Sequence, residues 1–328
     1  MQSVAIFNNK GGVGKTTLLC NLASFLAKER NKRVLIVDAD PQCNATQSIF
    51  GDEFLANYYE EKQFTITSIV NPLSKGKGFS SIFKPIKSDS FGLDVLVGNP
   101  DLGLTEDLLA TDWVQATNGD VRGMRTTLLF RHLLEQCEDY DFVFFDMGPS
   151  LGSINRAVLL SSDFYLTPMA MDIFSVKAIA NISKSLKTWG TKYQNGLSAI
   201  DDLDDLEVNN PEWKLKYVGY VTQQYTFKRD GHGAARPVKA FDRIMRQMPN
   251  AVDTHLNKDA IPLADLEIGL IPTLHSLVPL SQTSRKPIFD LSSSDGVVGA
   301  HFSKVREFRT TISKIADKFL MNIDRGDA

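Results

Sequence analysis

Short apolar segments alternate along the chain with longer segments whose apolar residues recur at helical spacing. The apolar segments are continuous rather than alternating, which is typical of strands in a parallel sheet covered on both faces. They occupy residues 4–7, 33–40, 93–98, 140–148, 164–169, 215–221 and 266–272. Segments of helical spacing include residues 16–29, 124–136 and about 300–320. The pattern predicts an α/β fold with a mostly parallel, twisted sheet of about seven to eight strands and helices on both faces.

Two segments interrupt this alternation. Residues 51–90 are polar and aromatic, with SKGKGFSS in their middle, and residues 194–212 are acidic. Neither segment continues the order of strand and helix, so we expect an exposed insertion at each place. The rest of the pattern is continuous and predicts a single domain over residues 1–328.

The stretch NNKGGVGKTT, residues 8–17, links the first predicted strand to the first predicted helix. Its glycines allow a tight backbone whose N–H groups point inward, and such a nest at a helix N-terminus binds phosphate. Lys15 is then expected to reach the β- and γ-phosphates, and the Thr16 hydroxyl to contact Mg²⁺. The residues expected to bind the nucleotide are Gly11, Gly12, Val13, Gly14, Lys15, Thr16 and Thr17.

The loop departs from the usual phosphate-loop pattern at two positions. Asn9 stands where the first glycine is expected, and Lys10 adds a second lysine. With these features KGGVGKTT resembles the deviant Walker A motif of the ParA/MinD family of ATPases, closest to its free-standing, Soj-type members. In that family a lysine at the position of Lys10 reaches the phosphates of a second nucleotide-bound subunit. The resemblance therefore implies a catalytic role for Lys10 beside Lys15, and a homodimer that forms with ATP.

Two further motifs resemble those of the same family, and each places acids at the end of a predicted strand. In RVLIVDADPQCNAT, the resemblance implies that Asp40 orients the attacking water and that Asp38 supports Mg²⁺ and its waters. In DFVFFDMGPSLG, it implies that Asp146 holds Mg²⁺ through a water. The second motif departs from the family, because a single proline, Pro149, stands where two are common. The later stretch IPTLHSLVPLSQTSRKPIFDL resembles a segment near the adenine, which makes Pro272 a candidate base contact.

Overall charge gives no general attraction to nucleic acid, because the net charge is −3 and DNA contact needs a local basic surface. The family resemblance implies non-specific DNA binding by the ATP dimer. Candidate contacts are Lys228, Arg229, Arg236, Arg243 and Arg246, with the C-terminal helix and its Lys304, Arg306, Arg309, Lys314 and Lys318. The apolar stripe of that helix favours packing on the sheet. We expect no membrane contact, since MNIDRGDA, at the end of the chain, is short and acidic at its end.

These features predict a ParA-like ATPase with ATP and Mg²⁺ as cofactors. It would dimerise with ATP, hydrolyse it slowly, and serve DNA partition or cargo positioning with a ParB-like activator, in the cytoplasm or on the nucleoid. Two alternatives stay open: a metabolic or assembly enzyme of the same superfamily, and a nucleotide-sensing regulator with little turnover. Iron–sulfur carriers are disfavoured, because the three cysteines are far apart and include no C-x-x-C pair.

Overall fold

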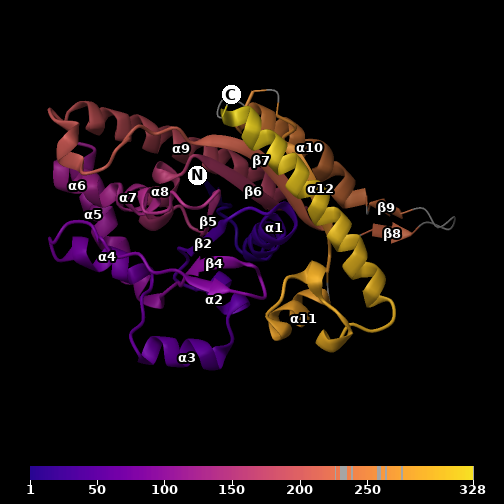
Figure 1. Cartoon of the computed structure of the whole chain (residues 1–328). Coiled ribbons are helices and arrows are strands. Elements are labelled where there is room, and N and C mark those ends of the chain that lie inside the picture. The colour runs from indigo at the N-terminus through magenta and orange to yellow at the C-terminus, as the bar shows by residue number, and fades with distance from the viewer. Residues whose placement is uncertain are drawn as a thin grey trace.

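Eight strands form one sheet in the computed structural model, in the order β10-β7-β6-β1-β5-β2-β4-β3 (Figure 1). Neighbouring strands are parallel except β3 and β4. The predicted fold class is thereby confirmed. The strands are β1 (Gln2–Ile6), β2 (Val34–Asp38), β3 (Ile86–Ser88), β4 (Leu93–Leu96), β5 (Phe142–Asp146), β6 (Phe164–Ala170), β7 (Lys216–Tyr225) and β10 (Glu267–Pro272), and β8 (Phe227–Arg229) pairs separately with β9 (Ala235–Pro237).

The structure describes the backbone of most of the chain. The described residues are 1–225, 227–229, 235–237, 239–256, 260–262, 264–274 and 276–327. Side chains are described for these residues except 224–243, 245, 246 and 327.

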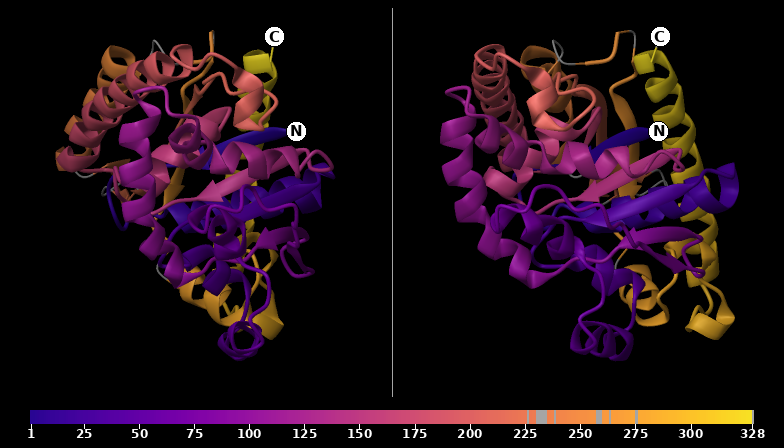
Figure 2. Two further views of the ribbon diagram at one scale, coloured as in Figure 1. Left: turned by 90° about the vertical axis from the view of Figure 1, so that its left-hand side faces the viewer. Right: turned by 60° about the vertical axis from the view of Figure 1, so that its left-hand side comes forward.

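Helices cover both faces of the sheet (Figure 2). Residues of α1, α2, α11 and α12 pack on one face, and residues of α4 to α10 pack on the other. The helices are α1 (Lys15–Arg30), α2 (Asn44–Ile49), α3 (Asp52–Glu60), α4 (Ile66–Ser74), α5 (Glu106–Ala116), α6 (Val121–Thr127), α7 (Leu129–Glu135), α8 (Ser153–Ser161), α9 (Ile173–Ser198), α10 (Lys239–Leu256), α11 (Leu277–Ser284) and α12 (His301–Asp327), with 3₁₀ turns η1 (Pro100–Thr105), η2 (Leu203–Leu206), η4 (Ile288–Asp290) and η5 (Ser293–Asp295).

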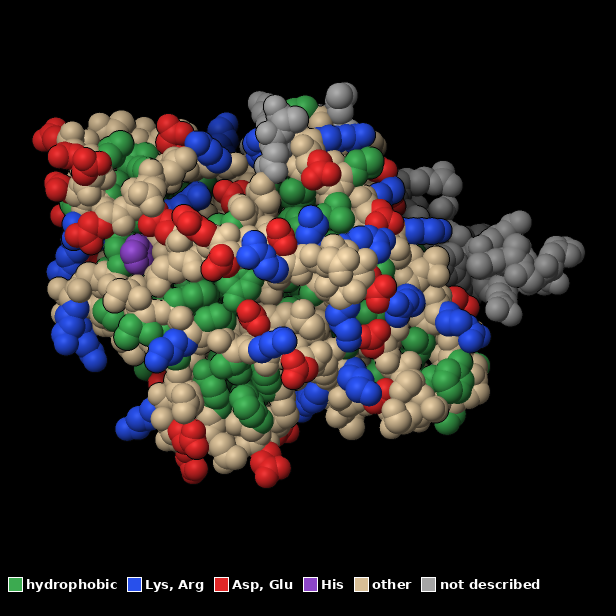
Figure 3. Space-filling model, viewed as in Figure 1, with side chains coloured by type: hydrophobic (Ala, Val, Ile, Leu, Met, Phe, Trp, Pro, Cys, Tyr) green, Lys and Arg blue, Asp and Glu red, His purple; other side chains and the backbone are tan. Residues whose placement is uncertain are grey.

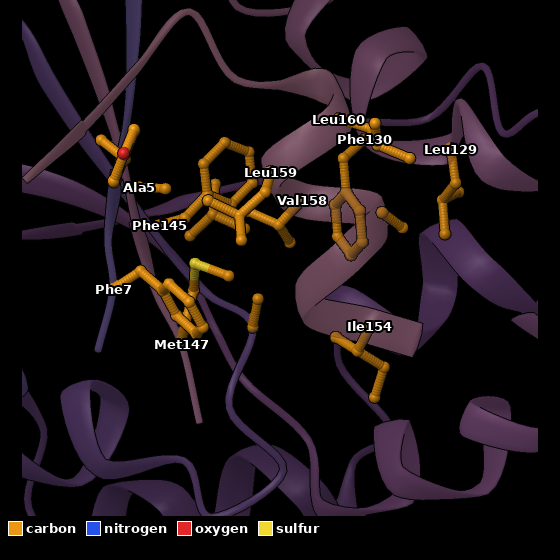
Figure 4. Close-up of a cluster of buried hydrophobic side chains, with 14 of the residues drawn as sticks. Ala5, Phe7, Leu129, Phe130, Phe145, Met147, Ile154, Val158, Leu159 and Leu160 are labelled. Carbon is orange, nitrogen blue, oxygen red and sulfur yellow. The ribbon is translucent and has the colours of Figure 1, made fainter. Parts of the chain in front are cut away.

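The central strand β1 shows why both faces need cover. Its successive side chains point to opposite faces, so Val4 and Ile6 join the core beneath α1 and α12. Ala5, and Phe7 just beyond the strand, join the core under α7 and α8, where Phe145 and other apolar side chains converge (Figure 4). All of these side chains are fully buried, which fixes the strand ends that carry the candidate site.

Three predicted segments differ in detail from the structure. The helix expected at 124–136 is two short helices, α6 and α7, separated at Leu128. Residues 51–90 contain α3, α4 and β3, and α4 contributes Ile66, Ile69 and Val70 to the main core. Residues 194–212 contain the end of α9 and the turn η2.

The last helix, α12, closes the fold as its apolar stripe predicts. Val305, Phe308, Ile312, Ile315 and Phe319 are buried, whereas Phe302 at its start is 38% exposed. In the described part of the chain, no helix is both long and apolar enough to cross a membrane.

Candidate nucleotide site

The phosphate loop connects the end of β1 to the first turn of α1. Gly12 and Gly14 have φ of 72° and 78°, in the left-handed region that favours glycine. Asn9 is not among the described non-glycine residues with positive φ, so the position where a glycine is usual does not require one here. The departure from the common pattern is therefore compatible with an intact loop.

Gly14 is further constrained by the side chain of Gln223, at the end of β7. The Gln223 amide donates a hydrogen bond to the Gly14 carbonyl at 3.0 Å. A Cβ atom on Gly14 would lie 2.6 Å from Gln223 Oε1, closer than real contacts allow. Gln223 is buried and thus positions the loop at the N-terminus of α1, a role that the sequence alone did not indicate.

Lys15 lies inside the loop with only 8% of its surface exposed. Its ammonium donates to the carbonyl of Lys10 at 3.3 Å. Burial lowers the pKa of Lys15, and the nearby charges of Asp146 and Asp40 oppose that effect. A poorly solvated cation in this position gains by meeting the phosphate oxygens of a nucleotide.

The side chain of Lys10, unlike that of Lys15, pairs with an acid outside the phosphate loop. Its ammonium forms an ion pair with Asp172, which also caps α9 by accepting from the Ser175 N–H at 2.9 Å. Burial alone would raise the pKa of Asp172, but the hydrogen bonds from Lys10 and Ser175 outweigh it and hold that pKa below its usual value. The backbone N–H of Lys10 donates to Asn8 Oδ1 at 3.1 Å, and Asn8 donates to the Pro168 carbonyl at 2.8 Å. Lys10 is thus held at the rim of the loop.

Asp38 and Asp146 end neighbouring parallel strands in register with each other. Both are fully buried. Burial raises the pKa of Asp38 to about 6, although hydrogen bonds from Thr46 oppose the shift. Burial, and then the charge of Asp38, raise the pKa of Asp146 well above its ordinary value. Two buried carboxylates placed together, where the charge of Lys15 only partly opposes the rise in the pKa of Asp146, are an arrangement that a cation would stabilise.

The donor set fits Mg²⁺ bound together with a nucleotide. The Thr16 hydroxyl donates to Asp146 Oδ2 at 2.8 Å, while Asp146 Oδ1 is buried without a hydrogen-bond partner in the described structure. Over the described residues, no three or more His, Cys, Asp or Glu side chains gather as a metal cluster. That is expected for Mg²⁺, which takes one or two protein oxygens and completes its shell with phosphates and waters.

Asp40 faces a cavity of about 250 Å³ at the mouth of the phosphate loop. It is 5% exposed, and its Oδ1 accepts a hydrogen bond from the Gln42 N–H at 3.0 Å. The residues lining the cavity are Gly11, Gly12, Gly14, Lys15, Thr16, Thr17, Asp40, Gln42, Asn44, Ser48, Pro149 and Gln282. The structure therefore brings most of the predicted phosphate-binding residues and Asp40 around one space.

A second cavity of about 350 Å³ adjoins the first and shares Asn44, Ser48 and Gln282 with it. It lies between α2 and α11 and reaches Arg285, whose guanidinium contacts the Gln47 carbonyl. Pro272, the predicted base contact, is the last residue of β10 and lines neither cavity. Asn44 belongs to the motif RVLIVDADPQCNAT, and the α11 residues belong to the stretch 271–291 that was expected near the adenine. Pro272 was the contact predicted in that stretch, whereas the α11 residues that line the cavities were not predicted.

The loop after Asp146 is held by side chains from two helices. Asn155 of α8 donates to the carbonyls of Gly148 and Ser150 at 2.8 and 2.7 Å. Glu106 of α5 accepts from the backbone N–H groups of Ser153 and Ile154 at the start of α8. Gly148 faces Asp40, since a Cβ placed on it would lie 3.3 Å from Asp40 Oδ1. These contacts hold the loop that follows Asp146 and contains the single proline Pro149.

The predicted DNA contacts separate into two groups. Side chains of the first group lie outside the described residues, namely Lys228, Arg229, Arg236, Arg243 and Arg246. On α12, Arg309 pairs with Glu29 at 2.6 Å and Lys318 pairs with Asp265 at 2.6 Å. Lys304, Arg306 and Lys314 are exposed on the same helix, so part of its basic charge is already neutralised within the chain.

Comparison with known proteins gives consistent matches. A family model described as an AAA domain matches residues 1–199. The chain is 30% identical to the chromosome-partitioning ATPase Soj of Thermus thermophilus, over 57% of this chain and 62% of that protein. It is 30% identical to the chromosome partitioning protein ParA of Myxococcus xanthus, over 56% and 57% respectively. These matches span less than two thirds of each relative.

Solved structures match over a larger share of the chain. Protein DIP2308 of Corynebacterium diphtheriae has a TM-score of 0.70 and 32% identity, over 87% of this chain and 97% of that one. A variant McdA–ATP complex of Cyanothece has a TM-score of 0.61 and 16% identity, over 94% and 95%. Cobyrinic acid a,c-diamide synthase of Mycobacterium smegmatis, with ADP and magnesium, has a TM-score of 0.51 and 22% identity, over 76% and 82%. The last two show likeness of fold alone.

Proposed function

This chain belongs to the ParA/MinD family of P-loop ATPases, with Soj-like relatives, and we propose that it is a switch that dimerises with Mg-ATP and reverts on slow hydrolysis. Backbone N–H groups of the phosphate loop, residues 11–17, would bind the phosphate oxygens at the N-terminus of α1. Lys15 adds its charge from inside the loop. Binding therefore relies on groups that are already in place in the single chain.

Thr16 and Asp146 would hold Mg²⁺, with Asp38 supporting its bound waters. When bound, the ion would neutralise the charge that develops on the transferred phosphoryl group. The unpartnered Oδ1 of Asp146 supports this assignment. Asp40, at the cavity mouth, would orient the attacking water, because a loose transition state mainly requires positioning.

The position of Lys10 carries the proposal of a dimer. Its ammonium does not line the phosphate cavity of its own chain but is held at the rim by Asp172. The pair is partly exposed, with 28% and 35% of the two side chains accessible. A surface ion pair of this kind holds its partners weakly, by roughly 0–1 kcal/mol, so Lys10 can leave Asp172 and reach the phosphates of a facing subunit. A lysine supplied in this way stabilises transition-state charge much as an arginine finger does.

Partition or cargo positioning is the role that the Soj and ParA relatives support. We propose that the dimer binds DNA non-specifically through the basic residues after β7 and the exposed cations of α12, and that a ParB-like protein stimulates hydrolysis. The protein would then act in the cytoplasm, in part on the nucleoid. Non-specific DNA binding should weaken steeply with salt.

A metabolic ligase is the second candidate, because cobyrinic acid a,c-diamide synthase shares the fold. Such an enzyme would need a second substrate near the γ-phosphate, and its turnover would not respond to DNA or depend on dimerisation.

The mass of an Asp40→Ala variant in solution tests the switch. With ATP and Mg²⁺, light scattering should give the mass of a dimer that persists, and with ADP the mass of a monomer. A Lys15→Ala variant is the control, since it should stay monomeric in both. An Asp40→Ala protein that binds ATP and remains monomeric would exclude the switch and favour the ligase.

A further inference from the structure

The helix α3 projects from the lower edge of the molecule, away from the two helical layers (Figures 1 and 2). Its inner side is anchored by Leu55 and Tyr58, which pack against Val97 beyond β4. Phe54, about one helical turn before Tyr58, flanks this anchored side and is 45% exposed. Phe54 lies between Phe50 and Tyr58, with ring centroids 5.1 and 5.7 Å away. The helix thus offers a preordered aromatic surface to the solvent.

Acidic side chains surround this aromatic surface. Asp52 and Glu53 stand at the start of α3, and Glu60 and Glu61 at its end, all of them exposed. Residues 50–61 contain no lysine or arginine, but the exposed Lys62 follows directly and Arg285 of the neighbouring turn lies 3.4 Å from Asp52. Figure 3 shows acidic side chains along the lower edge of the molecule, with hydrophobic side chains above them.

Hydrogen bonds connect α3 to the candidate magnesium site. The Tyr59 hydroxyl donates to the Gly98 carbonyl at 2.9 Å, and the Gly98 N–H donates to Thr46 Oγ1 at 2.9 Å. The Thr46 N–H in turn donates to Asp38 Oδ2 at 2.8 Å. Gly98 also packs closely, since a Cβ placed there would lie 3.0 Å from the Asp38 carboxylate. Three consecutive hydrogen bonds thus form a continuous path from Tyr59 of α3 to Asp38.

We propose that α3 is a docking surface for a basic, amphipathic segment of another protein, and that its occupancy adjusts hydrolysis through Tyr59 and Asp38. The charge of the α3 surface and its exposed aromatic ring favour a partner of this kind. The four acids repel nucleic acid and anionic lipid, and a twofold contact between two α3 helices would oppose like charges. A segment with lysine or arginine around one apolar side chain would satisfy both the acids and Phe54. The effect on hydrolysis rests on the proposed function; the docking itself does not.

Binding is tested with a fluorescein-labelled helical peptide of lysine, leucine and alanine, whose leucines lie on one face, by fluorescence anisotropy on the full chain. Phe54→Ala should weaken binding at least about tenfold, as expected for an aromatic anchor. The paired charge reversal Glu53→Lys with Glu60→Lys should do the same and leaves the aromatic packing intact. Val114→Ala, at an apolar position of α5 that is 57% exposed, is the matched control and should bind like the unmodified protein. Absence of peptide binding, or equal binding by all variants, would overturn the docking surface.

The proposed connection between α3 and Asp38 is tested separately, by the rate of ATP hydrolysis. The peptide should change the rate of ATP hydrolysis by the unmodified protein, and Tyr59→Phe should bind the peptide equally well but lose this change. A Tyr59→Phe protein that responds fully would refute the connection. If the unmodified protein binds peptide through α3 but hydrolyses no ATP, the proposed function fails while the docking surface stands.

Discussion

Replacing Asp38 with asparagine is expected to stabilise the nucleotide-free protein even though it impairs the site. Asp38 is fully buried beside Asp146, and its pKa is raised from 3.8 to about 6, mainly by burial. An asparagine keeps nearly the same shape, and its amide oxygen can still accept the hydrogen bond from the Thr46 N–H. The substitution therefore removes the buried charge, at the cost of the weaker hydrogen bond that Asp38 Oδ1 accepts from the Asp40 N–H at 3.4 Å.

The size of the effect follows from the pKa. A shift of roughly two units corresponds to about 3 kcal/mol, at about 1.4 kcal/mol for each unit. The pKa of Asp38 in the folded state lies above its unfolded value, so the folded protein binds the extra proton between about pH 4 and 6. Ionised Asp38 thus destabilises the folded state fully above about pH 6, and this cost is relieved as the pH falls through 6 toward 4.

Urea unfolding in EDTA without nucleotide measures the prediction. At about pH 7.5 the Asp38→Asn protein should be more stable by about 1–3 kcal/mol, and the gain should shrink by about pH 5.5. Asp139→Asn, at a side chain that is fully exposed, should change little at either pH. A destabilising Asp38→Asn substitution, or a gain that does not depend on pH, would refute the reasoning from burial.

Two further substitutions probe the loops. Gly14→Ala should lower ATP affinity about tenfold in a titration with fluorescent ATP, since it adds left-handed strain of about 1–2 kcal/mol and displaces the Gln223 amide that holds the loop. Gly51→Ala, with open space around it, is the control, and unchanged affinity of Gly14→Ala would show that the loop is not the binding element. Asn155→Asp replaces a donor to the Gly148 carbonyl with an oxygen that repels it, so steady-state hydrolysis should fall about tenfold or more while ATP affinity stays within about threefold. Equal loss of both would argue for general unfolding instead.

The pattern of apolar residues along the chain was sufficient to predict most strands of the sheet. Each of the seven apolar segments contains a strand, because strands buried on both faces need continuous apolar residues. The antiparallel edge strand β3 has only three residues and lies within the polar segment 51–90, so periodicity could not reveal it. The break at Leu128 likewise has no proline or glycine beside it to mark the end of a helix.

Spacing along the chain also located the phosphate loop and the acids that end β2 and β5. It could not locate the residues that hold them, because those contacts join distant parts of the sequence. Asn8 reaches Pro168, and Gln223 reaches Gly14. Such pairings depend on the order of strands in the folded sheet, and nothing in the local sequence distinguishes these amides from surface ones.

The central claim is that Lys10 acts on the nucleotide of a second subunit, and the Lys10→Ala variant tests it most directly. Its ATP affinity, measured by titration, and its mass with ATP, measured by light scattering, should be determined on the same preparation. We expect affinity within about threefold of the unmodified protein, because Lys15 and the loop N–H groups remain, together with loss of the ATP-dependent dimer or of hydrolysis. A Lys10→Ala protein that dimerises with ATP and hydrolyses it at the full rate would contradict the account.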